Sequence, residues 1–479
     1  MTKKLTKLIA LLLSAMMLLS LTACGGNGDG KGDEGSKSEM SAEMQAIDEY
    51  FKDYPAFDMG GRVIKIAVFY DMYYDSFDES LEDNPGLEDV ERGQLMFDNV
   101  KRIEEKYNCK IEYVNPGSEA LKSSLQTSVV AGTPDYDVYL TQMSFALALA
   151  VNGYFTDLST IKGDYLDLNN DQNILRTLEM AGTNCFFEKS VPNVTTTYLA
   201  YNAEMIKDAG LTDPRELYAN GEWTWEKFAE YCTKLTKDTD NNGETDIFGY
   251  GGDLQMTIQE FLASNDAILV KEDGNEGLSD PKVLETFTYL GQLYSEKKVA
   301  RPVVDDYYEG LYGWINKQNA FGPTKMWVLQ TGAKDIDFEY HIVPFPQGPS
   351  GQGENAGQSF GDYFVIPRGV KDPDKVYQVL EEFFGWYCDD YDVRDEDMIA
   401  IGEGCFMDEA DLTMAFEMGN WGCGDIWTEI DNSTSPNREE GSLINGIFSF
   451  VINGEKTAAE AVESVKQPFQ DDINSILNP

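Results

Sequence analysis

The stretch that decides the fold is Arg62-Val63-Ile64-Lys65-Ile66-Ala67-Val68-Phe69, a run of mostly apolar residues that predicts a β-strand. After it, apolar residues recur at helical spacing over residues 97–107, and residues 110–114 alternate as a second strand. A strand, a helix and a strand in this order predict a parallel βαβ unit, because parallel strands need such a crossover. The part of the chain that starts here is therefore expected to be α/β.

The same alternation of strands and helices continues along the chain. Residues 121–129 have a helical pattern that Gly132-Thr133-Pro134 ends, and residues 137–140 follow as a strand. Residues 198–201 form a further predicted strand, and Thr224 is placed to cap another helix. Helices are therefore expected to surround sheets throughout.

The N-terminus has the features of a lipoprotein export signal. Leu21-Thr22-Ala23-Cys24 resembles the lipobox of bacterial lipoproteins, and it follows an apolar run at residues 8–21 that is preceded by lysines. Residues 1–23 are therefore predicted to be a signal peptide. Cys24 is predicted to carry the acyl chains that anchor the protein on the outer face of the bacterial cell membrane. The alternative is ordinary secretion with a coincidental cysteine.

Residues 24–60 are expected to be a flexible tether that connects this anchor to the folded part. The stretch 25–36 is rich in glycine and small polar residues, which cannot bury enough apolar surface to become ordered, so it predicts a flexible tether. From Gly61 onward about four hundred residues remain, which is more than one hydrophobic core usually holds. Two lobes are therefore expected on length alone.

The composition is strongly acidic. The chain of 479 residues has 37 Lys and Arg against 84 Asp and Glu, and its formal net charge is −47. Such a surface repels the phosphates of nucleic acids and of anionic lipids. We therefore expect no nucleic-acid partner, and membrane contact only through the lipid anchor.

Besides Cys24 the chain has further cysteines, without a C-x-x-C motif or another metal-ligand spacing among them. They are Cys109, Cys185, Cys232, Cys388, Cys405 and Cys423. Buried free thiols are favoured over disulfides, because a core of this size needs no cross-link. Cys405 and Cys423 form the pair to test for a bridge.

Four short segments carry a resemblance to a known family. They are, in order, Ala131–Val138, Leu199–Leu211, Thr224–Phe228 and Ala320–Trp327. Their order and spacing, together with the lipobox, resemble the family 1 extracellular solute-binding proteins, the maltose-binding-protein-like receptors of ABC importers. Two details depart from the family's pattern. Tyr136-Asp137 is inserted before the aliphatic residue of the first segment, and Phe321 replaces a methionine in the last.

The resemblance implies a class II periplasmic-binding-protein-like fold, in which two hinged α/β lobes close on a ligand in a central cleft. It places residues 61–190 and 323–367 in the N-terminal lobe, and residues 195–320 and 370–479 in the C-terminal lobe. It also implies a monomer without catalytic activity or cofactor. Such a protein passes a small solute, here expected to be a mono- or oligosaccharide, to the permease of an ABC importer.

A sugar site needs flat aromatic rings and side chains that donate and accept several hydrogen bonds. Residues of these types follow predicted strands or stand in loops, where such sites form. They are Asp71, Tyr73, Gln142, Trp327, Asp362 and Trp421. Gln142 and Asp362 are expected at the carboxyl ends of two strands. Trp225, in contrast, lies on the apolar stripe of its predicted helix and is expected in the core.

The stretch 238–246 resembles the first nine positions of an EF-hand calcium loop. The oxygen-bearing side chains that match its ligand positions are those of Asp238, Asp240, Asn242 and Asp246. Gly249 occupies the twelfth position, where EF-hands have a bidentate glutamate. The loop therefore predicts either weak structural calcium binding or an acidic surface turn.

Catalysis is the competing interpretation. Gly357–Gly361 has the G-x-S-x-G pattern of a serine hydrolase, but a strand is predicted after it where a helix is required. The only histidine, His341, precedes Ser359, against the order of that fold. A glycan-degrading enzyme with two carboxylates stays open on residue types alone, as does a surface adhesin or a sensor's receptor. Turnover of a glycan would identify the enzyme.

Overall fold

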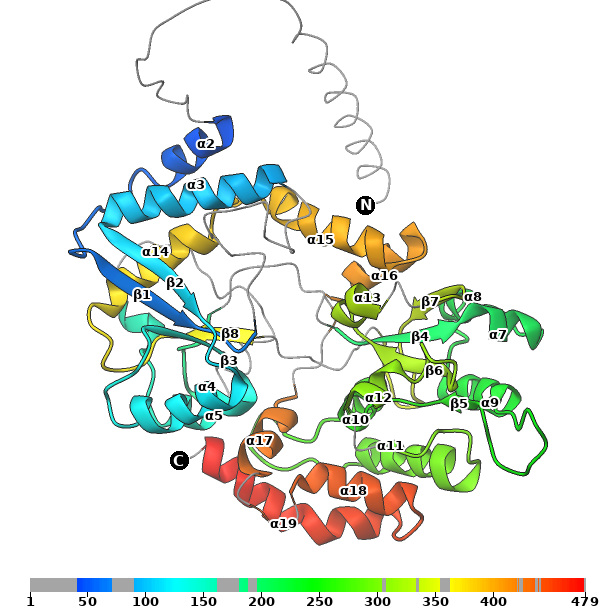
Figure 1. Ribbon diagram of the computed structural model, residues 1–479. Helices are drawn as coiled ribbons and strands as arrows, with labels where there is room; N and C mark the ends of the chain where they lie inside the picture. Colours follow the sequence, from blue (N-terminus) through cyan, green and yellow to red (C-terminus); the bar gives the residue numbers. More distant parts are fainter. Residues whose placement is uncertain are drawn as a thin grey trace, which may run out of the picture. The chain divides into compact units, whose positions relative to one another are not determined.

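The computed structural model describes residues 41–70, 90–161, 181–187, 196–303, 307–332, 336–353, 362–419, 421, 425–435, 438 and 441–477. Over these residues the chain forms two four-stranded sheets, each covered by helices (Figure 1). None of the helices in the described ranges is both long and apolar enough to cross a membrane.

The first sheet has the strand order β2-β1-β3-β8. β1 (Arg62–Ala67) lies between β2 (Cys109–Val114) and β3 (Val138–Gln142), and the three strands run parallel. α3 (Val90–Tyr107) connects β1 with β2, which confirms the predicted βαβ unit. β8 (Asp362–Val365) pairs with the other side of β3 in the antiparallel direction.

Apolar side chains on both faces of this sheet are buried under helices. Ile64 and Ile66 of β1 pack with residues of α3 and of α14 (Pro373–Phe384). Tyr139 of β3 packs on the other side, with Leu121. The helical segments of that side are α4 (Ser118–Ser124), the π-helix Leu125–Val129 and α5 (Met143–Val151), and a 3₁₀ turn, Leu158–Thr160, comes after them.

The second sheet has the strand order β5-β6-β4-β7. Its strands are β4 (Tyr198–Asn202), β5 (Phe248–Tyr250), β6 (Asn319–Thr324) and β7 (Tyr340–Val343). β4 pairs antiparallel with both β6 and β7, whereas β5 pairs parallel with β6.

Helices lie between and around the strands of the second sheet (Figure 1). They are α7 (Ala203–Asp208), α8 (Pro214–Ala219), α9 (Trp225–Leu235), α10 (Leu254–Ala263), α11 (Pro281–Gly291), the π-helix Gln292–Glu296, α12 (Tyr307–Tyr312) and α13 (Met326–Gly332). Thr224 caps α9 as expected, since its Oγ1 accepts the N–H of Lys227 at 3.4 Å.

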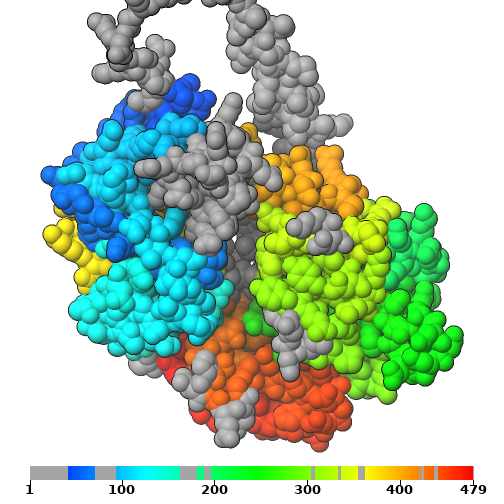
Figure 2. Space-filling model, in the orientation of Figure 1, coloured from blue at the N-terminus to red at the C-terminus, as the bar shows by residue number. Residues whose placement is uncertain are grey.

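The C-terminal part of the chain is helical. Its helices after α14 are α15 (Tyr391–Cys405), α16 (Glu409–Met418), α17 (Trp427–Thr434), α18 (Leu443–Ile452) and α19 (Ala458–Leu477). α17 contacts both α5 and α19, and α18 packs against α11. In Figure 2 the orange to red surface of α18 and α19 adjoins a green surface, and both helices contact α11. Thr457 and Glu460 form a capping box at the start of α19.

Part of the predicted tether is folded. Residues 42–50 form helix α2 (Ala42–Tyr50), and the side chains of Met44 and Phe51 are buried. They pack with Leu95 of α3 and with Trp386. The prediction of a flexible tether up to residue 60 is therefore wrong from residue 42 onward, because apolar residues at helical spacing give this stretch a face to bury.

The lobe boundaries predicted from the sequence differ from the sheet membership in two places. The range 323–367 was expected in the N-terminal lobe, but it contains β7 and the last residues of β6, which pair with β4 in the second sheet. Residues from 370 onward were expected in the C-terminal lobe, but α14 packs against α3 of the first sheet. An apolar pattern shows that a segment is extended or helical, but it does not show which sheet the segment joins.

Cys109, Cys185, Cys232 and Cys388 carry free thiols. Burial raises the pKa of Cys109 to about 11 and that of Cys185 to about 12, so these thiols stay protonated at neutral pH. Cys405 is buried. Cys423 lies outside the described residues, so a bridge between it and Cys405 stays a prediction.

Candidate functional site

Two of the predicted ligand residues meet at one edge of the first sheet. Gln142 ends β3 and Asp362 begins β8, and the two are Cα partners in the antiparallel ladder. Asp362 therefore stands at the amino end of its strand, so the prediction of a carboxyl end was wrong. Because β8 runs antiparallel, its amino end lies beside the carboxyl ends of the parallel strands. Gln142 and Asp362 are thus neighbours, and both are partly exposed.

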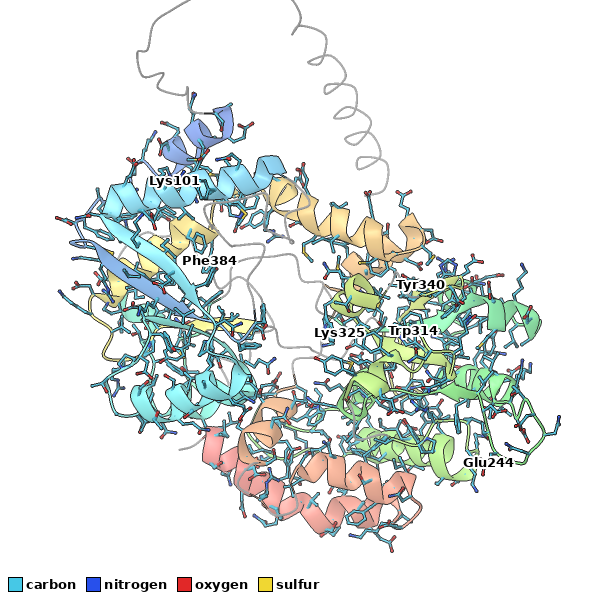
Figure 3. The ribbon with its side chains drawn as sticks, viewed as in Figure 1. Lys101, Glu244, Trp314, Lys325, Tyr340 and Phe384 are labelled. Atoms are coloured by element: carbon cyan, nitrogen blue, oxygen red, sulfur yellow. The ribbon has the colours of Figure 1, made fainter. Side chains whose placement is uncertain are left out.

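Lys325 lies at the turn that leads from β6 into α13 (Figure 3). Its side chain interacts electrostatically with Glu260, Asp253 and Asp362. We call these four residues the Lys325 cluster. Burial lowers the pKa of Lys325, and the three carboxylates oppose that effect. One ammonium group therefore compensates carboxylates from β8 of the first sheet and from α10 with its N-cap.

Two members of the Lys325 cluster belong to α10. Asp253 caps this helix, since its Oδ1 accepts the N–H of Met256 at 2.9 Å, and burial raises the pKa of its carboxyl. Glu260 lies further along α10 and is only 1% exposed. Taking carboxylates out of water is costly unless a cation compensates them. Lys325 is positioned to be that cation.

An aromatic row, consisting of Tyr308, Tyr312 and Trp327, lies on α12 and α13. Tyr308 is 61% exposed and Trp327 is 38% exposed. The rings of Tyr308 and Tyr312 are stacked, with centroids 6.5 Å apart. The hydroxyl of Tyr312 lies 3.0 Å from Oγ1 of Thr331, which donates to the backbone carbonyl of Trp327 at 3.1 Å. These contacts connect the three aromatic residues across the two helices.

The helix that carries two of these rings packs on the start of α10. A Cβ atom on Gly310 of α12 would stand 3.2 Å from Cα of Asp253, so glycine allows this close approach. The aromatic row is therefore a neighbour of the Lys325 cluster. Flat apolar rings next to charged and hydrogen-bonding side chains are the combination that binds polyhydroxylated ligands.

Trp225 is a core residue, which confirms the expectation from its helical stripe. It is 4% exposed, and its ring stacks on that of Tyr289 with centroids 4.3 Å apart. Its Nε1 donates to Oγ of Ser264 at 3.2 Å. A surface groove is lined by these two rings, by α9 and by residues 347–351. Because both rings are almost fully buried, they present little flat surface to this groove.

Trp421 is half-buried. Its ring lies 6.3 Å from that of Tyr218, and it packs against the core that contains residues of α16. This is the environment of a packing residue. Contact between Trp421 and a ligand stays a prediction.

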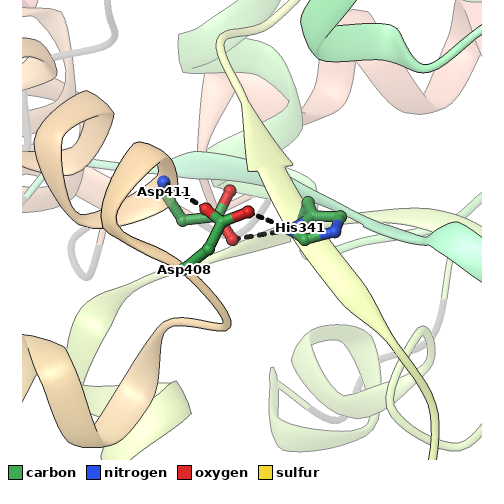
Figure 4. Close-up of side chains that lie close together, drawn as sticks. All are labelled: His341, Asp408 and Asp411. Carbon is green, nitrogen blue, oxygen red and sulfur yellow. Dashed lines mark hydrogen bonds and ion pairs between the residues drawn. The ribbon is translucent and has the colours of Figure 1, made fainter.

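His341 of β7 forms ion pairs with two aspartates at the start of α16 (Figure 4). Its Nδ1 lies 2.8 Å from Oδ2 of Asp411 and 3.8 Å from Oδ2 of Asp408. Burial opposes protonation of His341, but the hydrogen bond and charge of Asp411 outweigh it and raise the pKa. Nη1 of Arg215 lies 3.0 Å from Oδ1 of Asp411 and 2.9 Å from Oδ2 of Asp408. Because a guanidinium group already occupies the carboxylates, this is an ion-pair cluster rather than a metal centre.

The predicted calcium loop gathers its acidic side chains. Oxygen atoms of Asp238, Asp240 and Asp246 lie within 4.8 Å of one another, and all three residues are exposed. The backbone N–H of Asn242 donates to Oδ1 of Asp238 at 3.2 Å and to Oδ1 of Asp240 at 3.0 Å. The side-chain oxygen of Asn242 accepts a backbone N–H at 2.7 Å. Calcium binding by this loop stays a prediction.

The family model of the bacterial extracellular solute-binding proteins matches residues 94–387, which is more than half of the chain. The chain belongs to this family. The match confirms the resemblance that the four sequence segments indicated, and the family is one of binding proteins. A comparison with curated protein sequences found no match.

Solved structures of other solute-binding proteins resemble this one. UspC of M. tuberculosis has 14% identity and a TM-score of 0.57, over 86% of this chain and 100% of that chain. A Thermotoga lettingae protein bound to α-D-tagatose has 16% identity and a TM-score of 0.58, over the same shares. MalE of Bdellovibrio bacteriovorus bound to maltotriose has 13% identity and a TM-score of 0.56, again over 86% and 100%. At such identities the likeness shows the fold, which confirms the expected two-lobe α/β architecture.

Several predicted site residues of this solute-binding protein cannot be placed. Cys24, Asp71 and Tyr73 lie outside the described residues. Their roles stay predictions.

Sequence analysis missed five residues of the candidate site, namely Asp253, Glu260, Tyr308, Tyr312 and Lys325. Asp253 follows β5 by three residues and Lys325 directly follows β6. The strand-end argument that pointed to Gln142 could therefore have found them. Tyr308 has no comparable signal, because only its contact with Tyr312 places it in the row.

Proposed function

We propose that this solute-binding protein is the substrate-binding subunit of an ABC importer and that it captures a mono- or oligosaccharide. We further propose that acyl chains on Cys24 hold it on the outer face of the bacterial cell membrane, where it delivers the ligand to the permease. The observation that carries the ligand class is the aromatic row beside the Lys325 cluster.

The aromatic row is suited to sugar rings. Sugars present apolar C–H faces bordered by hydroxyl groups, so they stack on exposed aromatic rings and bond to polar groups at the edge. The ring of Tyr312 is held by its packing against Gly332, where a Cβ atom would stand 3.1 Å from its Cε1, and by the contact of its hydroxyl with Thr331. A ring fixed before binding loses little conformational entropy when a ligand arrives. The relatives bound to tagatose and to maltotriose support the same ligand class.

Ligand capture would proceed by closure of the two lobes. Gln142 and Asp362 belong to the first sheet, whereas the aromatic row and Lys325 belong to helices and turns of the second. A ligand that contacts both groups favours conformations in which the two approach each other. It shifts the population only as far as it binds the closed form more tightly than the open form.

A thermal-shift screen of the mature chain tests the ligand class. The panel contains mono- and oligosaccharides, with amino acids and peptides as comparators. A ligand at a hundred times its dissociation constant adds about 2.7 kcal/mol to the free energy of unfolding. We expect a saccharide to raise the melting temperature without being consumed. A shift by an amino acid or a peptide alone would contradict the proposal, and degradation of the sugar would favour an enzyme.

The anchor is tested separately. Replacing Cys24 by Ala removes the proposed acylation site, so we expect the protein to move from the membrane fraction to the medium. Metabolic labelling with palmitate provides the second measurement, since the variant should lose the label. Membrane association that survives the substitution would contradict the proposed lipid anchor while leaving the ligand class untouched.

A further inference from the structure

We infer that the candidate site selects saccharides by charge, and that the Lys325 cluster makes it favour uncharged saccharides over acidic ones. This rests on the proposed function, since it takes the ligand to be a saccharide. It goes further by naming the chemical class of the cargo and the residues that select it.

The Lys325 cluster lies where the ligand is proposed to bind. Asp362 is the Cα partner of Gln142 at the edge of the first sheet. Lys325 precedes Trp327 by two positions, and α12 with the rest of the aromatic row packs on Asp253. Among the described residues, one cation, Lys325, therefore interacts with three carboxylates beside the surface that would contact the sugar.

Arg301, a second cation near the start of α10, is paired with a carboxylate of its own. Arg301 lies against Gly251, where a Cβ atom would stand 3.0 Å from Cβ of the arginine. Its Nη2 lies 2.5 Å from Oε1 of Glu309 on α12. The guanidinium group thus compensates a carboxylate on the helix of the aromatic row and adds no net positive charge there.

These charges act differently on neutral and on acidic ligands. A ligand carboxylate could pair with Lys325 only by displacing a protein carboxylate. In a half-buried site, the repulsion between the ligand carboxylate and the protein carboxylates is stronger than it would be in bulk water. The hydroxyl groups of a neutral sugar donate to the partly exposed carboxylate of Asp362 and accept from the ammonium group without adding charge. The net charge of −47 also repels acidic ligands, and it does so over longer distances.

The test compares sugars that differ only in charge. Isothermal titration of the mature chain measures the affinities for galactose and galacturonate, glucose and glucuronate, galactobiose and digalacturonate, and cellobiose and cellobiouronate. In dilute buffer we expect the neutral member to bind at least about tenfold more tightly than its acidic counterpart. The difference should shrink at high salt, because screening weakens the repulsion.

Two matched variants show whether the Lys325 cluster is the cause. Asp362→Asn removes one carboxylate at a partly exposed strand end, and we expect it to reduce the neutral-to-acidic ratio by about threefold or more. Asp273→Asn makes the same change at an exposed turn on the second-sheet side of the chain and should leave the ratio unchanged.

The outcomes separate this inference from the proposed function. Equal or tighter binding of the acidic sugars would overturn the inference alone. An unchanged ratio in Asp362→Asn, or an equal change in Asp273→Asn, would overturn the assignment to the Lys325 cluster. If no saccharide of either kind binds, the proposed function fails and this inference fails with it.

Discussion

Nδ1 of His341 and Oδ2 of Asp411 lie 2.8 Å apart, and both side chains are buried. The histidine belongs to β7, at the end of the second sheet's strand order, and the aspartate belongs to α16. Oδ1 of Asp411 also accepts the backbone N–H of Ile342 at 3.3 Å. One carboxylate therefore holds the strand through both its main chain and its side chain, and the charge of a single imidazole contributes to this contact between strand and helix.

This contact makes the stability depend on pH. The folded-state pKa of His341 is raised above the ordinary value of 6.5. Its protonated form therefore stabilises the fold fully below the unfolded pKa, and this contribution is lost as the pH rises through the folded pKa. We expect the melting temperature of the wild type to fall more between about pH 6 and about pH 9 than that of His341→Asn, which keeps an N–H donor but cannot titrate. Parallel pH profiles would contradict a linked proton at this contact.

Glu429 on α17 makes a second pH-dependent contribution to stability, which can be tested separately. Burial raises its pKa from 4.5 to about 8, although Thr428 donates to its Oε2 at 2.6 Å. Because the folded pKa is raised, the stabilisation by the protonated carboxyl is complete below 4.5 and is lost as the pH rises to about 8. Glu429→Gln mimics the protonated form, so we expect it to be more stable than the wild type at about pH 9 and equally stable at about pH 4.5.

Urea unfolding at the two pH values measures the effect of Glu429→Gln. Glu417→Gln, on the exposed face of α16, is the control and should change the free energy of unfolding by about 0.5 kcal/mol or less. A gain from Glu429→Gln that does not grow with pH would show that the carboxylate is already ionised in the fold.

Two tryptophans allow a matched test of the ligand surface. Trp327→Ala removes an exposed ring of the aromatic row, so we expect ligand affinity to fall about tenfold while the ligand-free melting temperature stays nearly unchanged. Trp225→Ala removes a buried ring that stacks on Tyr289, so it should cost about 3–5 kcal/mol of stability. Calorimetric melting and ligand titration of both variants make the comparison. An equal loss of ligand-free stability in Trp327→Ala would assign that ring to the core.

The loop 238–246 is predicted to bind calcium weakly. Extracellular calcium modules have dissociation constants of roughly 10⁻⁴–10⁻³ M, and calcium at about ten times such a value adds about 1.4 kcal/mol. We expect calcium to raise the melting temperature of the wild type but not that of Asp240→Asn. Asp273→Asn, at another acidic turn, should keep the response. No response in the wild type would leave the loop as an acidic surface turn.

Much of the fold could be predicted because it is encoded locally. The period of the apolar residues was enough to define β1, α3 and β2, and Thr224 marked the start of α9. Sheet membership could not be predicted in this way. β7 and β8 form the same kind of ladder, and their partners, β4 and β3, are distant in the sequence.

The candidate site could be predicted only in part. Trp225 could be assigned to the core because it lies on the apolar stripe of its helix, whereas a ligand role for Trp327 stays a prediction. Lys325 stands at the end of a strand, but its role depends on carboxylates that two other elements supply, and no sequence pattern shows that these groups come together. The end of β8 on which Asp362 lies could not be known without the direction of that strand.

The packing of α14 on α3 has a consequence for biosynthesis. Asn99 Nδ2 donates to the carbonyl of Glu382 at 3.1 Å, across 283 positions of the sequence. The strands of the second sheet, in contrast, all lie within residues 198–343. The core of the first sheet is therefore complete only after β8 and α14 have been translated. The strands of the second sheet pair over shorter separations in the sequence. Since non-local contacts form slowly, the apolar surface of the first sheet stays uncovered until residues 362–384 have been made, and export factors and proteases would meet it in that interval.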